Sequence, residues 1–299
     1  MKTFSEKERV CEATFASGGP CWHAYTNGKE TPLLFNTSED YTLAINVIAQ
    51  SKAIFPGVVI IAFEVMENHF HFILSGYQND IMAFWSLICK RLARFYPHMR
   101  NMQLHLKSID CLQSLRNNIV YTHRNGYVVN SDHTPFSYPW GSGRYYFQDV
   151  PCMQTCGETK VDTLRKMFRG RAPQLPPEWK ILDGHVSPAS FCSVRFGMAM
   201  FRDAHHYFSM ISKNVEAYSE LAVDLDEGEF LTDAELFTEI SKVLKVKYGT
   251  DKVSSLSKAQ KFDLARILRH EFRSSNSQIR RLLGLTQYEV DSLFPTVRR

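Results

Sequence analysis

The stretch from Val58 to Gly76, VVIIAFEVMENHFHFILSG, constrains the fold more than any other part of the chain. Residues 58–65 form an almost unbroken apolar run rich in β-branched and aromatic side chains, which predicts a buried strand. A second strand is predicted over 69–75, where apolar residues alternate with His69 and His71. Successive side chains of a strand point to opposite faces, so the two imidazoles share one face. They are potential metal ligands presented by a rigid element.

The composition is that of an ordinary globular protein. The 299 residues are enough for two domains, and 44% are hydrophobic and 22% charged. No apolar run is long enough to span a membrane, and the segment MKTFSEKERV lacks the apolar core of a signal peptide. The seven cysteines include no CxxC pair, which favours reduced thiols. These features predict a cytoplasmic protein.

The order of predicted elements indicates the fold class. Strands over 21–26, 58–65, 69–75 and 104–107 alternate with helices that begin near residues 37, 80 and 110, the last ending at Gly126. This β-α-β-β-α-β order predicts an α+β chain with a ferredoxin-like, split βαβ antiparallel sheet covered by helices on one face. Residues 1–20 contain few periodic apolar positions and are expected to form a loose arm.

The helix predicted over 110–125 carries a second group of polar residues. Tyr121 and Asn125 stand four residues apart and therefore share a face, opposite the apolar positions of the helix. Taken alone, this pattern also fits an amphipathic helix with a half-buried tyrosine and solvated amides.

Several short motifs, in register, resemble a known family. VMENHFHFIL is similar to the Met-Pro-Asn-His-hydrophobic-His-hydrophobic signature of HUH transposases. YTHRNGYVV and SYPWGSGRYYF resemble their Tyr-x-His-x-Asn-Pro and Tyr-Pro-Trp-Ser-Ser-Tyr segments, and HAYTNGKETPLLF and RLARFY are similar to their first strand and a following helix. The subgroup that the chain most resembles is the REP-associated tyrosine transposases, over roughly residues 20–150.

The resemblance implies a set of roles. His69 and His71 would bind a divalent cation, Mg²⁺ or Mn²⁺, with Asn125 as the third ligand or its polar neighbour. Tyr121 would be the nucleophile that forms a 5′-phosphotyrosine linkage with single-stranded DNA beside a hairpin, without a nucleotide cofactor. The chain departs from the family pattern at two positions, because Glu67 and Gly126 stand where the family has proline.

Basic and aromatic residues near these motifs are candidates for DNA contacts. Arginine and lysine suit backbone phosphates, and aromatic rings stack on unpaired bases. The phosphate candidates are Lys90, Arg91, Arg94, Arg116 and Arg124, and the stacking candidates are Trp140, Tyr145 and Tyr146. The alternative is that the aromatic residues pack in the core and the basic residues only keep the surface soluble.

The C-terminal region is basic and predicted to be helical. From Lys252 to Arg299 the chain has ten Lys or Arg against four Asp or Glu, after an acidic stretch over 216–239. Helices are predicted over 257–272, 276–283 and 286–294, and the last two resemble a helix-turn-helix. Arg269, Arg273, Arg280 and Arg281 would then contact duplex DNA. A helical bundle that closes the core is the alternative.

The sequence thus predicts an arm over 1–20, a transposase-like domain over 21–150, an extension over 151–245 and a helix-turn-helix-like segment over 246–299. The favoured function is a metal-dependent endonuclease and strand transferase acting on single-stranded and hairpin DNA in association with the nucleoid. A DNA-binding protein that keeps the fold without cutting is the main alternative, and an RNA-binding sheet a weaker one. Whether two chains pair as a homodimer is left open.

Overall fold

A four-stranded antiparallel sheet forms the centre of the molecule. In the computed structural model, which describes residues 3–28, 31–129, 134, 136–152, 154–213, 221, 225, 233–272, 274 and 276–294, the strand order is β2-β3-β1-β4. The strands are β1 (Cys21–Tyr25), β2 (Val59–Val65), β3 (Phe70–Ser75) and β4 (His105–Ile109). Each neighbouring pair is antiparallel, with Tyr25 and Glu64 on either side of His71. Mixed helix and sheet of this kind is the α+β class predicted from the sequence.

Two helices cover the apolar face of the sheet. These are α2 (Ser38–Lys52) and α3 (Gln78–Leu92), which pack against each other. Phe70 of β3 lies against Trp85 of α3, with ring centroids 5.3 Å apart. Burial of each such ring is favourable by roughly 1.5–3 kcal/mol, so this face fixes which way β3 points.

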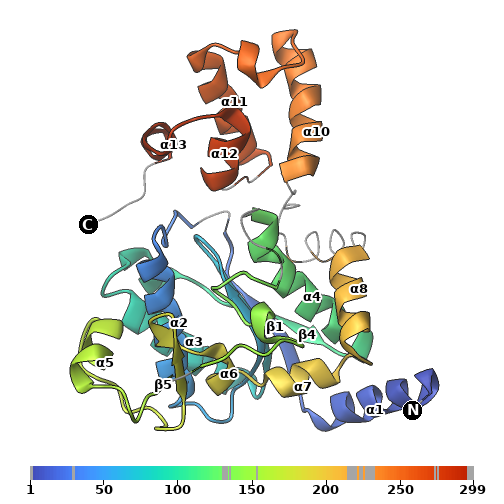
Figure 1. Ribbon diagram of the computed structural model, residues 1–299, viewed down its shortest axis with the longest axis vertical. Helices are drawn as coiled ribbons and strands as arrows, with labels where there is room; N and C mark the ends of the chain where they lie inside the picture. The colour runs from blue at the N-terminus through green and yellow to red at the C-terminus, as the bar shows by residue number, and fades with distance from the viewer. Residues whose placement is uncertain are drawn as a thin grey trace.

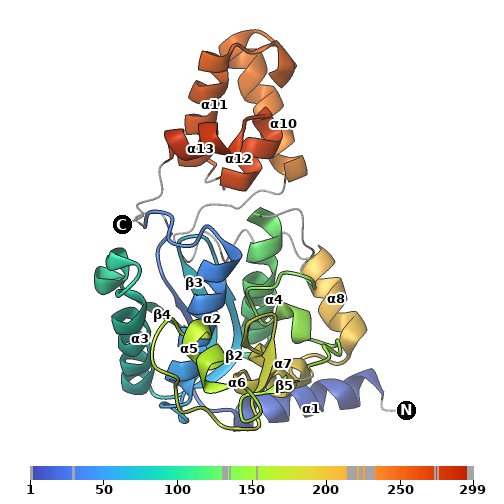
Figure 2. The ribbon, with the colours of Figure 1, turned by 60° about the vertical axis from the view of Figure 1, so that its left-hand side comes forward.

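The opposite face of the sheet is covered by α4 (Leu112–Val129), which contacts β2 and β3. Figures 1 and 2 show α4 and α8 (Ala204–Lys213) on the other side of the strands from α2 and α3. The prediction of helices on one face was therefore wrong. The polar face of β3 is enclosed as well.

The remaining elements of the larger unit pack around this centre. A second sheet, of order β5-β6-β7, lies against α2 through β7. These elements are α1 (Phe4–Ser17), η1 (Pro97–Asn101), η2 (Gly143–Tyr145), β5 (Gln154–Thr155), α5 (Val161–Met167), β6 (Lys180–Leu182), β7 (His185–Val186), α6 (Pro188–Phe191) and α7 (Val194–Ala199). One hydrophobic cluster runs from Cys11 to Ile211, so the residues after 151 share the core of the central sheet.

The C-terminal helices have a hydrophobic core of their own. Residues from Leu236 to Val290 form a separate cluster, at the end of the molecule drawn in orange and red in Figure 1. The elements are α10 (Asp233–Val243), η3 (Leu244–Tyr248), η4 (Val253–Ser255), α11 (Lys258–His270), α12 (Asn276–Leu283) and α13 (Gln287–Leu293). The acidic stretch over 216–239 lies mostly outside the described residues.

Two local predictions were wrong. The N-terminal segment is a helix, α1, whose first turn is closed by a capping box between Thr3 and Glu6. Helix α4 continues past Gly126 to Val129 instead of ending there. All seven cysteines are free thiols, as predicted. Among the described residues, no helix is long and apolar enough to cross a membrane.

Candidate active site

His69 and His71 lie side by side at the start of β3. Their ring centroids are 5.0 Å apart, and both side chains are buried on the face that α4 covers. The apolar face of β3 dictates this placement, because His71 alternates with the buried Phe70 and Phe72.

Helix α4 places Tyr121 against these histidines. The centroid of the phenol ring lies 5.7 Å from that of His71, and only 1% of the tyrosine is exposed. Asn125 follows one turn later on α4 and is completely buried. The structure thus brings together side chains that are about fifty residues apart in the sequence, in a closed site. The alternative interpretation of α4, an amphipathic helix with a half-buried tyrosine and solvated amides, is therefore wrong.

A third histidine, which sequence reasoning missed, completes the cluster. His23 of β1 is buried, and its ring centroid lies 5.4 Å from that of His71 and 5.8 Å from that of Tyr121. The alternation within CWHAY places His23 and Tyr25 on one face, which was readable from the sequence. The antiparallel pairing of β1 with β3, which brings that face to His71, was not.

The two histidines among the predicted metal ligands are neutral. Burial lowers the pKa of His69 to about 4 and that of His71 well below its ordinary value. Burial also lowers the pKa of His23 to about 4. Uncharged imidazoles are the form that ligates metals.

The segment before β3 holds His69 in one orientation. The Asn68 side-chain amide donates to the carbonyl oxygens of Gly28 and Thr31, both at 2.8 Å. Its oxygen therefore accepts from Nδ1 of His69, at 2.8 Å, which leaves the lone pair of that ring on Nε2. A Cβ atom on Gly28 would lie 2.9 Å from Nδ1 of His69, so this close approach requires glycine.

The donor chemistry of these residues fits a divalent cation. Two neutral imidazoles and the Asn125 amide are ligand types that transition metals and Mn²⁺ accept. The described residues contain no group of three or more His, Cys, Asp or Glu side chains arranged to hold a metal ion. Any cation would therefore depend on an amide ligand, on substrate oxygens and on water.

Glu64 is a second buried residue that sequence reasoning missed. It is the β2 partner of His71, and its Oε2 accepts from the backbone N–H of Gly126 at 2.7 Å. Burial raises the pKa of this carboxyl well above its ordinary value. The signal in the sequence was a lone glutamate inside the apolar run 58–65.

Gly126→Pro, the change to the family residue, is expected to destabilise the protein. Proline has no N–H for Glu64, and even a Cβ atom at this position would lie 2.5 Å from the ring of Tyr138. Proline inside a helix alone costs roughly 3 kcal/mol or more. Urea unfolding should show at least that loss, whereas Gly57→Ala, whose Cβ would meet only a carboxylate oxygen at 4.0 Å, is the control. Wild-type stability of the proline variant would contradict this account of Gly126.

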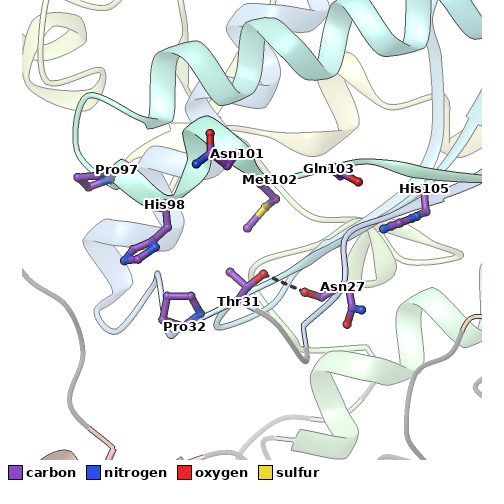
Figure 3. Close-up of a pocket in the computed structure, with 9 residues that line it drawn as sticks. All are labelled: Asn27, Thr31, Pro32, Pro97, His98, Asn101, Met102, Gln103 and His105. Carbon is purple, nitrogen blue, oxygen red and sulfur yellow. Dashed lines mark hydrogen bonds between the residues drawn. The ribbon is translucent and has the colours of Figure 1, made fainter.

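A polar cavity of about 610 Å³ lies beside the loop that holds His69. Figure 3 shows side-chain amides, imidazoles and a hydroxyl around it, contributed by the loop after β1, by η1 and by the start of β4. The lining residues are Asn27, Thr31, Pro32, Pro97, His98, Asn101, Met102, Gln103 and His105. None of the lining residues that the structure describes is acidic, and the amides match the hydrogen-bonding edges of a nucleobase.

The basic residues of the first domain that were predicted to contact phosphate differ in their exposure to solvent. Lys90 and Arg94 are exposed, and Arg91 is half-buried with its guanidinium donating to Oγ of Ser51 at 2.9 Å. Arg116 and Arg124 are buried, at 2% and 7% exposure. The prediction that these two contact phosphate conflicts with their burial.

Arg116 is held inside the protein by specific partners. It pairs with Glu8 of α1 at 2.6 Å and donates from Nε to the carbonyl oxygen of Met200. Hydrogen bonding from Arg116 lowers the pKa of the Glu8 carboxyl. This arginine therefore ties α4 to α1 and α7.

The aromatic stacking candidates are also largely enclosed. Tyr145 and Tyr146 are buried, and Tyr146 donates to the carbonyl oxygen of Ile61 at 2.8 Å. Trp140 is half-buried and stacks on Tyr41, with ring centroids 5.1 Å apart. Tyr145 and Tyr146 are thus part of the core, and their predicted role in base stacking was wrong.

In the C-terminal unit, Arg280 is exposed on α12. Arg281 pairs with Asp233 of α10 at 3.0 Å, and Arg269 donates to the carbonyl oxygen of Ser274 at 3.2 Å. Arg273 lies outside the described residues.

The comparisons with known proteins give one distant likeness. No family model and no curated protein matches the chain. One solved structure, described as a REP-associated tyrosine transposase bound to a REP hairpin, aligns with this chain at a TM-score of 0.37 and 15% identity. The alignment covers 56% of this chain and 94% of that one.

Proposed function

We propose that the chain is a metal-dependent single-strand DNA endonuclease and strand transferase, with Tyr121 as its nucleophile. The observation that carries the proposal is the meeting of Tyr121 with His71, from elements far apart in the sequence. The motif resemblance around both residues supports the same roles, and the strand order β2-β3-β1-β4 is compatible with the ferredoxin-like layout.

The proposed reaction is a transesterification. Oη of Tyr121 forms a bond to the scissile phosphorus as the bond from phosphorus to the 3′ oxygen breaks. The phenol loses a proton and the departing 3′ oxygen gains one, so the products are a 5′-phosphotyrosine and a free 3′-hydroxyl. Because one phosphodiester replaces another, the reverse reaction can rejoin strands without ATP.

His69, His71 and Asn125 are the residues proposed to hold Mg²⁺ or Mn²⁺. When bound, the cation supplies Lewis acidity and a template for the non-bridging phosphate oxygens. The imidazoles, being neutral, leave its positive charge undiminished for the phosphate. The rigid strand and helix keep nucleophile and ligands in one geometry, which is where much of the rate enhancement of such enzymes arises.

Two surface features support a DNA substrate. Lys90 and Arg94 are exposed on and just after α3, on the other side of the sheet from α4, and are proposed to contact backbone phosphates away from the site. The cavity in Figure 3 adjoins the loop that contacts His69 and offers amides to an unpaired base. We propose that single-stranded DNA next to a hairpin enters through this cavity, beside the loop that contacts His69.

The C-terminal unit is proposed to bind the duplex part of the same substrate. Helices α12 and α13 pack together across a turn at Gly284, whose φ of +60° favours glycine. Helix α13 begins with a capping box at Thr286 and presents Tyr288, which is 82% exposed. This arrangement is compatible with a helix-turn-helix, and exposed Arg280 would add a phosphate contact.

The proposal is tested with a DNA hairpin that carries a single-stranded flank. We expect the full-length protein to form a covalent adduct, resistant to SDS, in Mn²⁺ and none in EDTA. An RNA hairpin of the same sequence is the control for substrate class. Salt-sensitive binding to the DNA hairpin without any adduct would instead support the non-cleaving DNA-binding protein.

A further inference from the structure

A chain of hydrogen bonds connects α4 to the histidine that faces Tyr121. Nδ2 of Asn118 donates to the backbone carbonyl of Ser114 at 2.8 Å. Oδ1 of Asn118 lies 2.6 Å from Nδ1 of His23, and Nε2 of His23 lies 3.1 Å from Nδ1 of His71. His23 and Asn118 are both buried, so water does not compete for these bonds.

The Ser114 carbonyl determines which atom donates and which accepts in each of these hydrogen bonds. A carbonyl oxygen can only accept, so the amide nitrogen of Asn118 must face Ser114 and its oxygen must face His23. His23 therefore carries its proton on Nδ1 and accepts at Nε2. The proton between the two rings must then belong to Nδ1 of His71.

We propose that His23 and Asn118 are positioning residues that set the tautomer of His71 for a divalent cation. With the proton held on Nδ1, the lone pair of His71 lies on Nε2. Asn68 imposes the same tautomer on His69, so both imidazoles are prepared as ligands before a cation arrives. This inference rests on the proposed function, in that it concerns the cation site of that function.

Loss of the hydrogen bond from His71 to His23 is expected to lower the affinity for a divalent cation. Partners that orient metal-bound histidines typically contribute about 10–100-fold in metal affinity. Without an acceptor at Nε2 of His23, a neutral His71 could place its proton on either nitrogen, and the form protonated on Nε2 cannot ligate through that atom.

The tautomer is read directly in the metal-free, full-length protein. With ¹⁵N-labelled histidine, long-range ¹H–¹⁵N correlation spectra should show His71 protonated at Nδ1, and exposed His98 is the reference signal. A His71 signal protonated at Nε2 would overturn the proposal. This measurement needs neither a variant nor catalytic activity.

Two variants at one position test the consequence for binding. His23→Gln keeps an acceptor oxygen within reach of His71, whereas His23→Phe fills the space with an apolar ring. Mn²⁺ affinity, measured by electron paramagnetic resonance, should fall by about 10–100-fold in the Phe variant and by much less in the Gln variant. Equal affinities for the two variants would refute the role of His23. If wild-type protein with the expected tautomer bound no Mn²⁺, the proposed function would fail while the hydrogen-bond chain stood.

Discussion

Tyr121→Phe is expected to abolish the covalent protein–DNA adduct while leaving the protein folded. The change removes only the hydroxyl oxygen, and the phenyl ring still packs against His23 and His71. Loss of a nucleophile typically lowers the rate of such reactions by roughly 10³-fold or more. The substrate should be labelled at its 3′ end, because a 5′-phosphotyrosine keeps the 3′ part of the cleaved strand on the protein.

Two further tyrosines make this experiment decisive. Tyr77→Phe, at a residue that is 76% exposed, should form the adduct at the wild-type rate. Tyr25 is the β1 partner of His71, so Tyr25→Phe tests the nearest rival for the role of nucleophile. An adduct that survives in Tyr121→Phe and disappears in Tyr25→Phe would transfer the role to Tyr25. Thermal unfolding of each variant checks that the fold is retained.

Arg116→Leu is expected to destabilise the protein strongly and to leave DNA contacts unaffected. The change removes the main partner of Glu8 and the donor to the Met200 carbonyl, which leaves Glu8 with Arg202 at 3.2 Å. Because Glu8 is 27% exposed and keeps Arg202, we expect a loss near the lower end of the about 3–5 kcal/mol that breaking a fully buried ion pair costs. Urea unfolding followed by tryptophan fluorescence measures the loss.

Arg94→Leu is the matched control, because Arg94 is exposed where Arg116 is buried. Its stability should stay within about 0.5 kcal/mol of the wild type. Its affinity for single-stranded DNA should fall, and the salt dependence of binding should weaken by the equivalent of about one phosphate contact. If Arg116→Leu instead proved stable and bound DNA weakly, that result would support the sequence-based prediction that Arg116 contacts phosphate.

The strands and most helices were predictable because their signals are local. The apolar run at 58–65 and the alternation at 69–75 appear in the structure as β2 and β3 with little change. Helix α1 was missed because Cys11 is its only buried residue, so it lacks an apolar stripe, although the Thr3–Glu6 capping box was readable. The end of α4 was misplaced because Gly126 makes room for the ring of Tyr138 and is not a helix cap.

The candidate site was predictable only in part. His69, His71 and Tyr121 were identified through short motifs that resemble those of a known family. His23 and Glu64 could not be assigned, because their roles depend on strand register, which aligns them with the β3 histidines. The burial of Arg116 depends on α1 and on Met200, both distant in the sequence, so no local pattern could distinguish it from a surface arginine.

The near-complete burial of Tyr121 has a consequence for how such an enzyme would behave in a cell. A phenol sealed inside the protein cannot nick DNA that merely collides with the surface. Strand breakage would require an oligonucleotide that binds tightly enough to displace whatever covers the ring. Cleavage of DNA that is not the substrate would then be limited by the stability of the DNA-free protein. A mutation that loosens the packing of α4 would be expected to expose Tyr121 and to increase such cleavage.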